Sequence, residues 1–439
     1  MQTVDLLIDA RWVVPVEPAG TVLEHHSVAV QAGKIHAVLP SIDAAQRFET
    51  REHVVLGQHA LIPGLVNLHT HAAMTLMRGL ADDLPLMTWL TGHIWPAEAR
   101  HVSHAFVRDG TLLACAEMLQ GGVTCMNDMY FFPAAAAEAT LRAGMRAALG
   151  LIAIEFPTAY AASADDCLNQ GLALRDQLRH EELLSFCLAP HAPYTVSDAS
   201  FTRIAGYAAE LGLPVHVHVH ETAHEIADTA NAFGRAGERP LARLHRLGLV
   251  NPQLLAVHAV HLESHDIALL AKYGASVAHC PTSNLKLASG IAPLAALLDA
   301  GVNIGIGTDG AASNNRLDMF AEMRLAALLA KGASGRAEVL PAHAALHAAT
   351  LGGARALGLD HRIGSIMPGK CADLAAVDLG RIESQPVFDP LSHLVYVSAR
   401  TDVSDVWVNG RQVVKKQQLS WIEKQELESL ALLWQNRLK

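Results

Sequence analysis

Two histidines separated by one residue end the first long apolar run of the chain. His69 and His71 follow Leu65–Leu68, whose residues are typical of a buried strand. Residues i and i+2 of a strand project from the same face, so both imidazoles are expected to point the same way. Because imidazole is the commonest neutral metal ligand, the pair predicts a metal site. Two solvent-exposed histidines at a strand end would show the same spacing.

A second segment, Pro214–Glu221, alternates valine with three histidines. The alternation places His216, His218 and His220 on one face of a strand. Burying three polar rings costs free energy unless they find partners, so a polar site is expected beside this strand. The alternation does not say which imidazole binds a metal, and at least one of the three is expected to be a hydrogen-bonded core residue. Glu221 follows directly, where a carboxylate can act as general acid and base.

Two further candidate groups follow later apolar runs. Asp309 ends the glycine-rich stretch Gly301–Gly310, and His258 follows another short apolar segment. Taken alone, an aspartate followed by glycine is typical of a turn or a helix cap. Beside His69 and His71, however, the Asp309 carboxylate would complete a nitrogen and oxygen ligand set without thiolate. Such a set suits one Zn2+ per chain with an open position for water, and Fe2+ or Mn2+ would also fit.

The elements that must position these groups alternate between short apolar runs and stretches of helical period. Eight runs are candidate strands: Leu65–Leu68, Val123–Met126, Met145–Leu151, Leu184–Leu188, Pro214–Val219, Leu254–Val257, Ala275–Ala278 and Val302–Ile306. Alanine-rich segments supply helices: Ala105–Leu119, Pro133–Ala143 and Met319–Lys331. The alternation predicts an α/β fold, a (β/α)8 TIM-like barrel, whose strands end at one active-site face. A doubly wound open sheet is the alternative, but no G-x-G-x-x-G motif follows the first strand.

Both ends of the chain are rich in β-forming residues and predict a smaller second domain. Strands are expected at Val4–Ile8, Val28–Val30, Lys34–Val38, Ala372–Val377 and Val403–Val414. The Asn409-Gly410 pair within the last of these favours a type I′ hairpin. We expect a β-sandwich domain from residues 1–58 and 366–439, with the metal-dependent hydrolase barrel, residues 59–365, inserted between them. The helical stretch Trp421–Leu438 would either dock on its own barrel or contribute to a homo-oligomer.

Composition narrows the classes of protein and partner. The 439 residues are 51% hydrophobic and 17% charged, which is typical of a globular protein with a large core. A net charge of -10 without a Lys/Arg-rich run argues against a nucleic-acid partner. The six cysteines form no C-x-x-C pair, as expected of free thiols in a reducing compartment. Since neither a signal peptide nor an apolar run of ~18 residues is present, we expect a cytoplasmic protein without membrane association.

Six longer stretches of the chain form a recognisable series. They are Pro63–Asp82, Pro190–Tyr194, His218–Thr222, Pro281–Leu287, Gly307–Asn315 and Gly369–Asp378. In this order they resemble the amidohydrolase superfamily, and most closely its methylthioadenosine/S-adenosylhomocysteine deaminases, which are TRZ/ATZ-type hydrolases. The resemblance covers nearly the whole chain. It implies a zinc-dependent hydrolytic deaminase that converts the 6-amino group of an adenosine-like nucleoside to the inosine analogue and ammonia.

The resemblance also implies a role for each candidate group at the metal centre. The implied ligands are His69, His71, His218 and Asp309. The H-x-x-E spacing selects His218 from the three alternating histidines and makes Glu221 the proton shuttle, in contact with the substrate. His258, together with Asp309, would orient the attacking water. The roles of the other two alternating histidines stay open.

For the substrate, the resemblance implies that Glu98 binds the ribose hydroxyls and that His191 contacts the base. Trp89 would form a wall of the nucleoside pocket. The chain departs from the family where members that accept S-adenosylhomocysteine carry arginines, because Leu149–Ala164 contains neither Arg nor Lys. A buried carboxylate would lack a partner there. The departure predicts 5′-methylthioadenosine as the best substrate, with adenosine also accepted and S-adenosylhomocysteine disfavoured.

Two other functions fit the same residues. A related aminohydrolase could act on a free base or a triazine, such as guanine or cytosine, in which case a ribose-binding Glu98 would have no purpose. A metal-free, non-catalytic relative could have kept the barrel, but such a relative is expected to lose ligands, and every ligand position is filled here.

Overall fold

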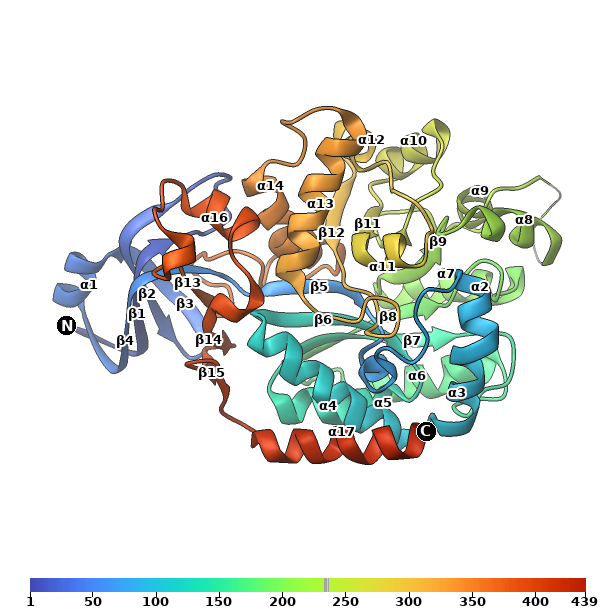
Figure 1. Cartoon of the computed structure of the whole chain (residues 1–439), viewed down its shortest axis with the longest axis horizontal. Coiled ribbons are helices and arrows are strands. Elements are labelled where there is room, and N and C mark those ends of the chain that lie inside the picture. The colour runs from blue at the N-terminus through green and yellow to red at the C-terminus, as the bar shows by residue number, and fades with distance from the viewer. Residues whose placement is uncertain (233–234, 236) are drawn as a thin grey trace.

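Eight parallel strands form the central sheet of the computed structural model, which describes residues 1–232, 235 and 237–439. In order they are β5 (Leu65–Thr70), β6 (Val123–Tyr130), β7 (Arg146–Ala153), β8 (Leu184–Pro190), β9 (Val215–Val219), β10 (Leu254–His258), β11 (Ser276–His279) and β12 (Asn303–Ile306). Each overlaps one predicted strand. Figure 1 shows these strands at the centre of the molecule with helices around them. The predicted (β/α)8 barrel is therefore confirmed.

The first and last barrel strands meet at a seam that depends on glycine. The backbone N–H of Asp309 donates to the His69 carbonyl (2.9 Å), and the N–H of Thr308 donates to the Asn67 side chain (2.9 Å). A Cβ at Gly307 would lie 2.7 Å from the backbone nitrogen of His69, which is closer than Cβ contacts normally come. Glycine thus permits the close approach. The seam brings the carboxylate of Asp309 beside the first strand.

The helices that follow the strands pack apolar faces on the barrel. They include α4 (His104–Gln120), α5 (Pro133–Ala143), α6 (Ala164–Leu178), α7 (Asp198–Leu211), α10 (Ser264–Tyr273), α12 (Leu294–Asp299) and α13 (Met319–Ser334). The side chains of Ser103, Ser163 and Ser197 begin α4, α6 and α7 by accepting a backbone N–H. The three predicted alanine-rich helices correspond to α4, α5 and α13.

Three connections at the carboxyl ends of the strands carry additional helices (Figure 1). Between β5 and α4 lie α2 (Leu86–Trp89), a π-helical turn (Leu90–Ile94) and α3 (Trp95–His101). After β9 come α8 (Ala223–Ala232) and α9 (Pro240–Arg246), and between β11 and α12 lies α11 (Pro281–Lys286). Barrel enzymes build their active sites from these connections. All three supply candidate site residues or their neighbours.

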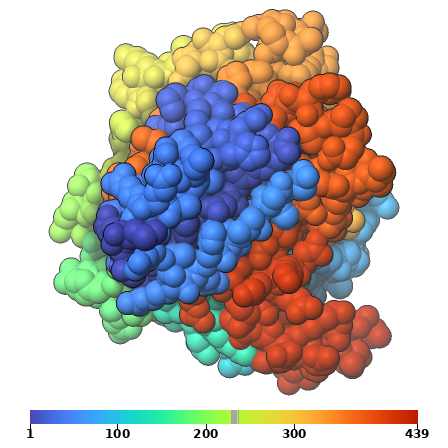
Figure 2. Space-filling view, turned by 90° about the vertical axis from the view of Figure 1, so that its left-hand side faces the viewer, coloured from blue at the N-terminus to red at the C-terminus, as the bar shows by residue number. Residues whose placement is uncertain are grey.

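Both termini form a second sheet of eight strands beside the barrel. Its order is β16-β15-β14-β13-β4-β1-β2-β3. The bounds are β1 (Gln2–Val13), β2 (Leu23–Gln31), β3 (Lys34–Pro40), β4 (Phe48–Pro63), β13 (Leu374–Asp378), β14 (Val403–Val408), β15 (Arg411–Lys415) and β16 (Gln418–Leu419). Figure 2 shows the N-terminal and C-terminal segments side by side on this face. The predicted smaller unit built from both termini is confirmed.

The terminal sheet curls so that its two ends approach each other. The N–H of Ala372 donates to the Gly33 carbonyl (2.8 Å), and the N–H of Gly410 donates to the Ala372 carbonyl (3.0 Å). A shared core that includes Ile8 and Trp407 lies inside the curl. The β14–β15 turn has positive φ at both central residues, Asn409 (49°) and Gly410 (76°), as a type I′ turn requires.

A buried ion pair joins this sheet to the barrel. Arg146, on β7, donates to both carboxylate oxygens of Asp373 (2.8 and 3.1 Å). Strand β4 runs to Pro63 and continues through Gly64 into β5. The expected boundary between residues 58 and 59 therefore falls within β4, and the division into two domains stays a prediction. Strand β4 and helix α1 (Ser41–Arg47) were not anticipated from the sequence.

Helix α17 (Lys424–Leu438) packs along the outside of the barrel (Figure 1). The buried Trp434 donates its Nε1–H to Asp109 of α4 (2.9 Å) and stacks edge-on against Phe106. This is the docking alternative of the sequence analysis, while a homo-oligomer stays a prediction. None of the helices in the described part of the chain has the length and apolar character that a membrane span needs. All six cysteines are buried and unpaired.

Candidate active site

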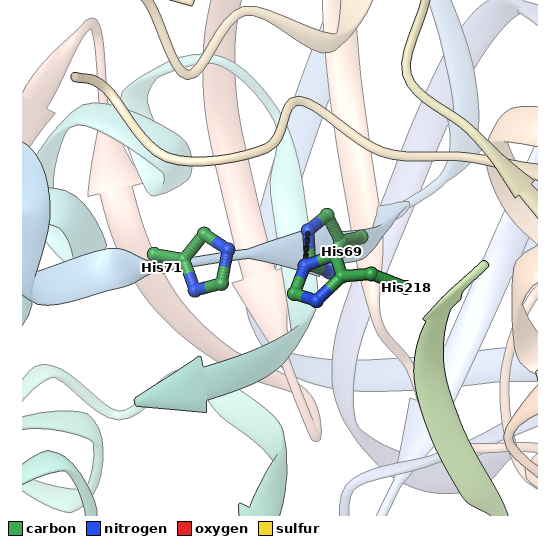
Figure 3. A group of neighbouring side chains, drawn as sticks. All are labelled: His69, His71 and His218. Atoms are coloured by element: carbon green, nitrogen blue, oxygen red, sulfur yellow. Dashed lines mark hydrogen bonds between the residues drawn. The ribbon is translucent and has the colours of Figure 1, made fainter. Parts of the chain in front are cut away.

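Four potential ligand atoms converge at the carboxyl ends of β5, β9 and β12. The Nε2 atoms of His69 and His71 each lie 3.3 Å from Oδ1 of Asp309. The Nε2 atom of His218 lies 3.2 Å from Nε2 of His69. Figure 3 shows His69 and His71 on one strand, with His218 reaching toward them from another. The ligand atoms of His69, His71 and His218 lie within 4.8 Å of one another, and so do those of His69, His258 and Asp309.

Backbone carbonyl groups orient two of these imidazoles. Nδ1 of His71 lies 2.5 Å from the Met129 carbonyl, and Nδ1 of His218 lies 2.7 Å from the His191 carbonyl. A carbonyl only accepts hydrogen bonds, so each ring donates from Nδ1. In the neutral imidazole this leaves Nε2 with its lone pair directed at the centre. Partners of this kind hold the histidine ligands of metal sites in position.

Asp309 is held by two hydroxyl groups. Its Oδ2 accepts from Ser283 (2.6 Å) and Ser313 (2.7 Å), which leaves Oδ1 directed at the histidines. Burial opposes ionisation, but the hydrogen bond and charge of His69 hold the pKa of Asp309 well below its usual value. Burial lowers the pKa of His69 to about 4. At neutral pH the pair therefore consists of a carboxylate and a neutral imidazole, which are the forms that bind metal.

Glu221 and His258 face each other next to this centre. Oε2 of Glu221 lies 3.9 Å from Nε2 of His258, and Nδ1 of His258 lies 2.8 Å from the side-chain oxygen of Asn284. Burial raises the pKa of Glu221, which brings proton exchange by this carboxyl closer to neutral pH. His258 (φ 70°) and Asp309 (φ 62°) both have left-handed backbones. Such conformations are costly outside glycine and cluster at functional sites.

A cavity of about 360 Å³ opens onto three of the four converging residues, His71, His218 and Asp309. This volume is within the range of small-molecule sites. Every predicted site residue except the fully buried His69 lines it: His71, Trp89, Glu98, His191, His218, Glu221, His258 and Asp309. Apolar side chains from the α2–α3 connection and from residues 152–159 form much of the rest. The structure thus brings all the predicted site residues together.

Glu98 and His191 each form a hydrogen bond with a neighbouring hydroxyl group. The hydroxyl of Tyr130 donates to Glu98 (2.7 Å). Burial raises the pKa of Glu98 to about 7, although the Tyr130 hydrogen bond acts in the opposite direction. Nδ1 of His191 lies 2.9 Å from the hydroxyl of Thr195. Burial, with the charges of the nearby His71 and His69, lowers the pKa of His191 to about 3, so this ring is neutral at pH 7.

The structure separates the three alternating histidines of β9. Only His218 reaches the converging group. His216 lies one layer deeper, and its Nε2 is 2.8 Å from Nδ1 of His69. His220 lies at the strand end, where its Nε2 accepts the backbone N–H of Leu241 (3.2 Å). His216 therefore supports the ring of His69, and His220 belongs to the β9–α9 packing.

Several residues in this region were not singled out in the sequence. Ser283 and Ser313 lie within two of the six family stretches, so their positions were known but their contact with Asp309 was not. Tyr130 ends β6, but the predicted strand ended at Met126, so no sequence signal marked Tyr130. Glu225 accepts backbone N–H groups next to Glu221, and no sequence pattern indicated that contact.

The chain matches known proteins over nearly its full length. The Amidohydrolase family model matches residues 60–413. A 5-methylthioadenosine/S-adenosylhomocysteine deaminase from Teredinibacter turnerae is 48% identical over 99% of this chain and 98% of that protein. A protein of the same description from Saccharophagus degradans is 45% identical over 99% of this chain and 97% of that protein.

A solved structure agrees with these sequence matches. It is an adenosine deaminase from Xanthomonas campestris with bound zinc, 52% identical to this chain. The two structures superpose with a TM-score of 0.97, and the superposition covers 100% of this chain and 99% of that one. The resemblance inferred from the six stretches is confirmed. The chain is an enzyme of the amidohydrolase family.

Proposed function

We propose that this enzyme is a zinc-dependent hydrolytic deaminase that converts an adenosine-like nucleoside to its inosine analogue and ammonia. Its best substrate is 5′-methylthioadenosine, and adenosine is also accepted. The observation that carries the proposal is the convergence of three imidazole nitrogens and a carboxylate oxygen beside a cavity that also contains Glu98. In support, the relatives described above are deaminases of methylthioadenosine, S-adenosylhomocysteine or adenosine.

The residues present fit a divalent metal ion. His69, His71 and His218 offer imidazole nitrogens, and Asp309 offers an ionised oxygen. A set of this kind without thiolate suits zinc, and it would also accept Fe2+ or Mn2+. A bound ion supplies Lewis-acid activation of water, whose pKa it lowers toward about 7. The zinc bound to the Xanthomonas campestris relative supports zinc as the natural ion.

Glu221 moves the protons of the reaction. As the water oxygen bonds to C6 of the purine, the Glu221 carboxylate takes one water proton and delivers it to ring N1. It then transfers the second proton to the amine, which leaves as ammonia when the C–N bond breaks. Asp309 and His258 orient the water, because the Nδ1 contact of His258 with Asn284 leaves its Nε2 able to accept a hydrogen bond. A positioned acid and base of this kind contributes ~10²–10⁴ in rate.

Glu98 supports a nucleoside rather than a free base. Its carboxylate would accept hydrogen bonds from the two ribose hydroxyls, while Tyr130 holds it from behind (2.7 Å). His191 would contact the purine, and Trp89 would form part of the apolar wall. A free base or a triazine offers no hydroxyl pair to this carboxylate. A buried polar group without a partner is costly, so such substrates are expected to bind less well.

The wall near residues 152–159 supports an apolar 5′ substituent. Ile154 and Phe156 line the cavity there, and none of the described residues that line it is Lys or Arg. The carboxylate of S-adenosylhomocysteine would lose hydration without gaining a charged partner. A methylthio group loses little hydration and gains apolar contact. We therefore expect S-adenosylhomocysteine to be a poor substrate.

The test is ammonia release from 5′-methylthioadenosine, adenosine and S-adenosylhomocysteine by the zinc-loaded enzyme. We expect 5′-methylthioadenosine to have the highest kcat/KM. Glu221→Gln should lower kcat by ~10²–10⁴ while keeping its metal. Turnover of guanine, cytosine or a triazine, with no reaction of any adenosine analogue, would show that the proposed substrate class is wrong. Full activity of Glu221→Gln would contradict the proposed mechanism.

A further inference from the structure

One buried carboxylate is bound to the backbone that carries Glu221. The two oxygens of Glu225 accept the backbone N–H groups of His220 (2.9 Å) and Glu221 (2.7 Å). Glu225 lies at the beginning of α8 and is 4% exposed. We infer that Glu225 is a positioning residue, which holds the backbone of Glu221 so that its side chain stays at the reacting atoms. The inference rests on the proposed function of Glu221.

The backbone needs such support because the chain leaves strand β9 at this point. Val219 is the last residue of β9, and the N–H groups of the next two residues point away from the ladder. His220 has a left-handed backbone (φ 56°), which costs free energy in a residue other than glycine. Without an acceptor, the two N–H groups would also be buried and unsatisfied. Glu225 satisfies both of them with one side chain.

Other contacts hold the far side of the same turn. The carbonyl of His220 accepts the N–H groups of Val260 and His261, both at 2.9 Å. The Glu225 N–H donates to the hydroxyl of Thr222 (3.2 Å), which ties the carboxylate-bearing residue to the same turn. The turn is therefore held from two sides. Glu225 is the part of this arrangement that contacts the Glu221 backbone directly.

Burial of the Glu225 carboxyl group costs free energy, which points to a role for this residue. Burial raises the pKa of Glu225 to about 8, against the effect of its own amide hydrogen bonds. An uncharged residue of similar size would avoid the free-energy cost of burying a second carboxyl group beside Glu221. Glu225 does not line the main cavity, whereas Glu221 does, with Oε2 3.9 Å from His258. It acts through Glu221 and does not contact the substrate.

The test is the isosteric substitution Glu225→Gln, which puts an NH2 group against one of the two N–H donors. We expect kcat for 5′-methylthioadenosine to fall ~10–100-fold, because displacement of a catalytic group by about 1 Å has this effect. KM should change less than about threefold, since the ribose and base contacts are remote from Glu225, and metal content should stay at the wild-type level. A loss through general misfolding would change KM, metal content and thermal stability together.

The matched control is Asp109→Asn, which alters another buried carboxylate, whose partners are Trp434 and Arg108. Its kcat should equal that of the wild type. An unchanged kcat in Glu225→Gln, or a kcat loss matched by metal loss, would overturn the inference. A crystal structure of Glu225→Gln decides the case if the variant is unstable or if no nucleoside reacts with the wild type. In either case, a Glu221 carboxylate still 3.9 Å from His258 would overturn the positioning role, whereas wild-type inactivity alone would overturn only the proposed function.

Discussion

The two sides of the cavity are built in different ways. On the side of the proposed metal ligands, side chains project from strand ends, and several have fixed hydrogen-bond partners, such as the Met129 carbonyl for His71 and Ser283 for Asp309. On the side proposed to bind the nucleoside, apolar residues come from connections between strands and helices, and Glu98 has a hydrogen bond to Tyr130. On the first side, hydrogen bonds hold the side chains in position, whereas on the second side packing mostly determines their positions.

This difference places the groups for the chemical step on one side of the cavity and the groups that select the substrate on the other. Strand ends in a closed barrel have little freedom, so they suit groups that must hold an ion and a proton carrier in register. Connections tolerate changes of sequence and length, so they suit the part that selects the substrate. Substitutions on the strand-end side should therefore affect metal binding and kcat. Substitutions on the connection side should affect KM and the choice of substrate.

The largest effect is expected for Asp309→Ala on the strand-end side. Loss of the carboxylate should abolish metal retention and lower kcat/KM at least ~10³-fold, since a metal ion contributes several kcal/mol to such reactions. Metal per chain by mass spectrometry and ammonia release measure the two effects. The control Asp176→Ala changes an exposed aspartate. If Asp309→Ala kept its metal and its rate, the metal centre would have to lie elsewhere.

A smaller effect on the same side is expected for His216→Phe. This substitution removes the partner of His69 Nδ1 (2.8 Å) but leaves all four proposed ligands. Metal affinity should weaken ~10–100-fold, as it does when such supporting groups are lost. Competition with a chromogenic chelator measures the affinity, with the exposed His265→Phe as control. Unchanged affinity would show that metal binding does not depend on the hydrogen bond between His216 and His69.

On the connection side, Tyr130→Phe should raise KM rather than lower kcat. It removes one hydrogen bond to Glu98, worth about 1 kcal/mol, so KM for adenosine should rise ~5-fold. Steady-state kinetics of ammonia release separate the two parameters, and Tyr396→Phe on α16 (Pro390–Tyr396) is the control. A fall in kcat at constant KM would instead show that Tyr130 supports the chemical step and not substrate binding.

The pH dependence of KM tests the same carboxyl group. Because the pKa of Glu98 is raised to about 7, its carboxylate form grows as pH rises through 7. Ribose hydroxyls need an acceptor, so KM for adenosine should fall as pH rises through this value and level off above it. The Tyr130 hydrogen bond lowers this pKa, so Tyr130→Phe should move the transition to higher pH. A KM independent of pH in both proteins would exclude Glu98 as the ribose-binding group.

The smallest effect is expected for Phe156→Arg at the apolar wall. A guanidinium there would give the carboxylate of S-adenosylhomocysteine a partner. The gain in kcat/KM for this substrate, relative to 5′-methylthioadenosine, should be about two- to fivefold, as a partly exposed ion pair contributes up to ~1 kcal/mol. Phe156→Gln removes the ring without adding charge and should give no such gain. Equal gains in both variants would attribute selectivity to size rather than charge.

Much of the architecture followed from patterns within a few residues of each other. The eight barrel strands and four of the helices, α4, α5, α13 and α17, could be predicted because period 2 and period 3.6 are local properties. The Asn409-Gly410 turn followed from the conformations that only a few residues adopt. Strand β4 and helix α1 could not be predicted in this way. Residues 48–63 lack a clean alternation, since one part of β4 is exposed and the other is buried between two strands.

In the candidate site, too, local sequence patterns predicted some features, and the tertiary structure decided others. The sequence by itself determined that His69 and His71 share a face and that three histidines alternate on another strand. The alternation alone left His216, His218 and His220 equivalent; the family resemblance implied His218, and the tertiary structure shows why only this ring reaches the converging atoms. Period 2 makes these three equivalent, and their depth along the barrel distinguishes them.

The contacts of Asp309 with the first strand, of Tyr130 with Glu98 and of Glu225 with the Glu221 backbone are likewise tertiary. The first two join residues that are distant in sequence, and they form only when the barrel closes and its connections fold over the mouth. The third spans four residues but depends on the left-handed turn at His220. Alternation in sequence expresses which face a side chain is on, whereas distances between side chains depend on long-range packing of the whole barrel.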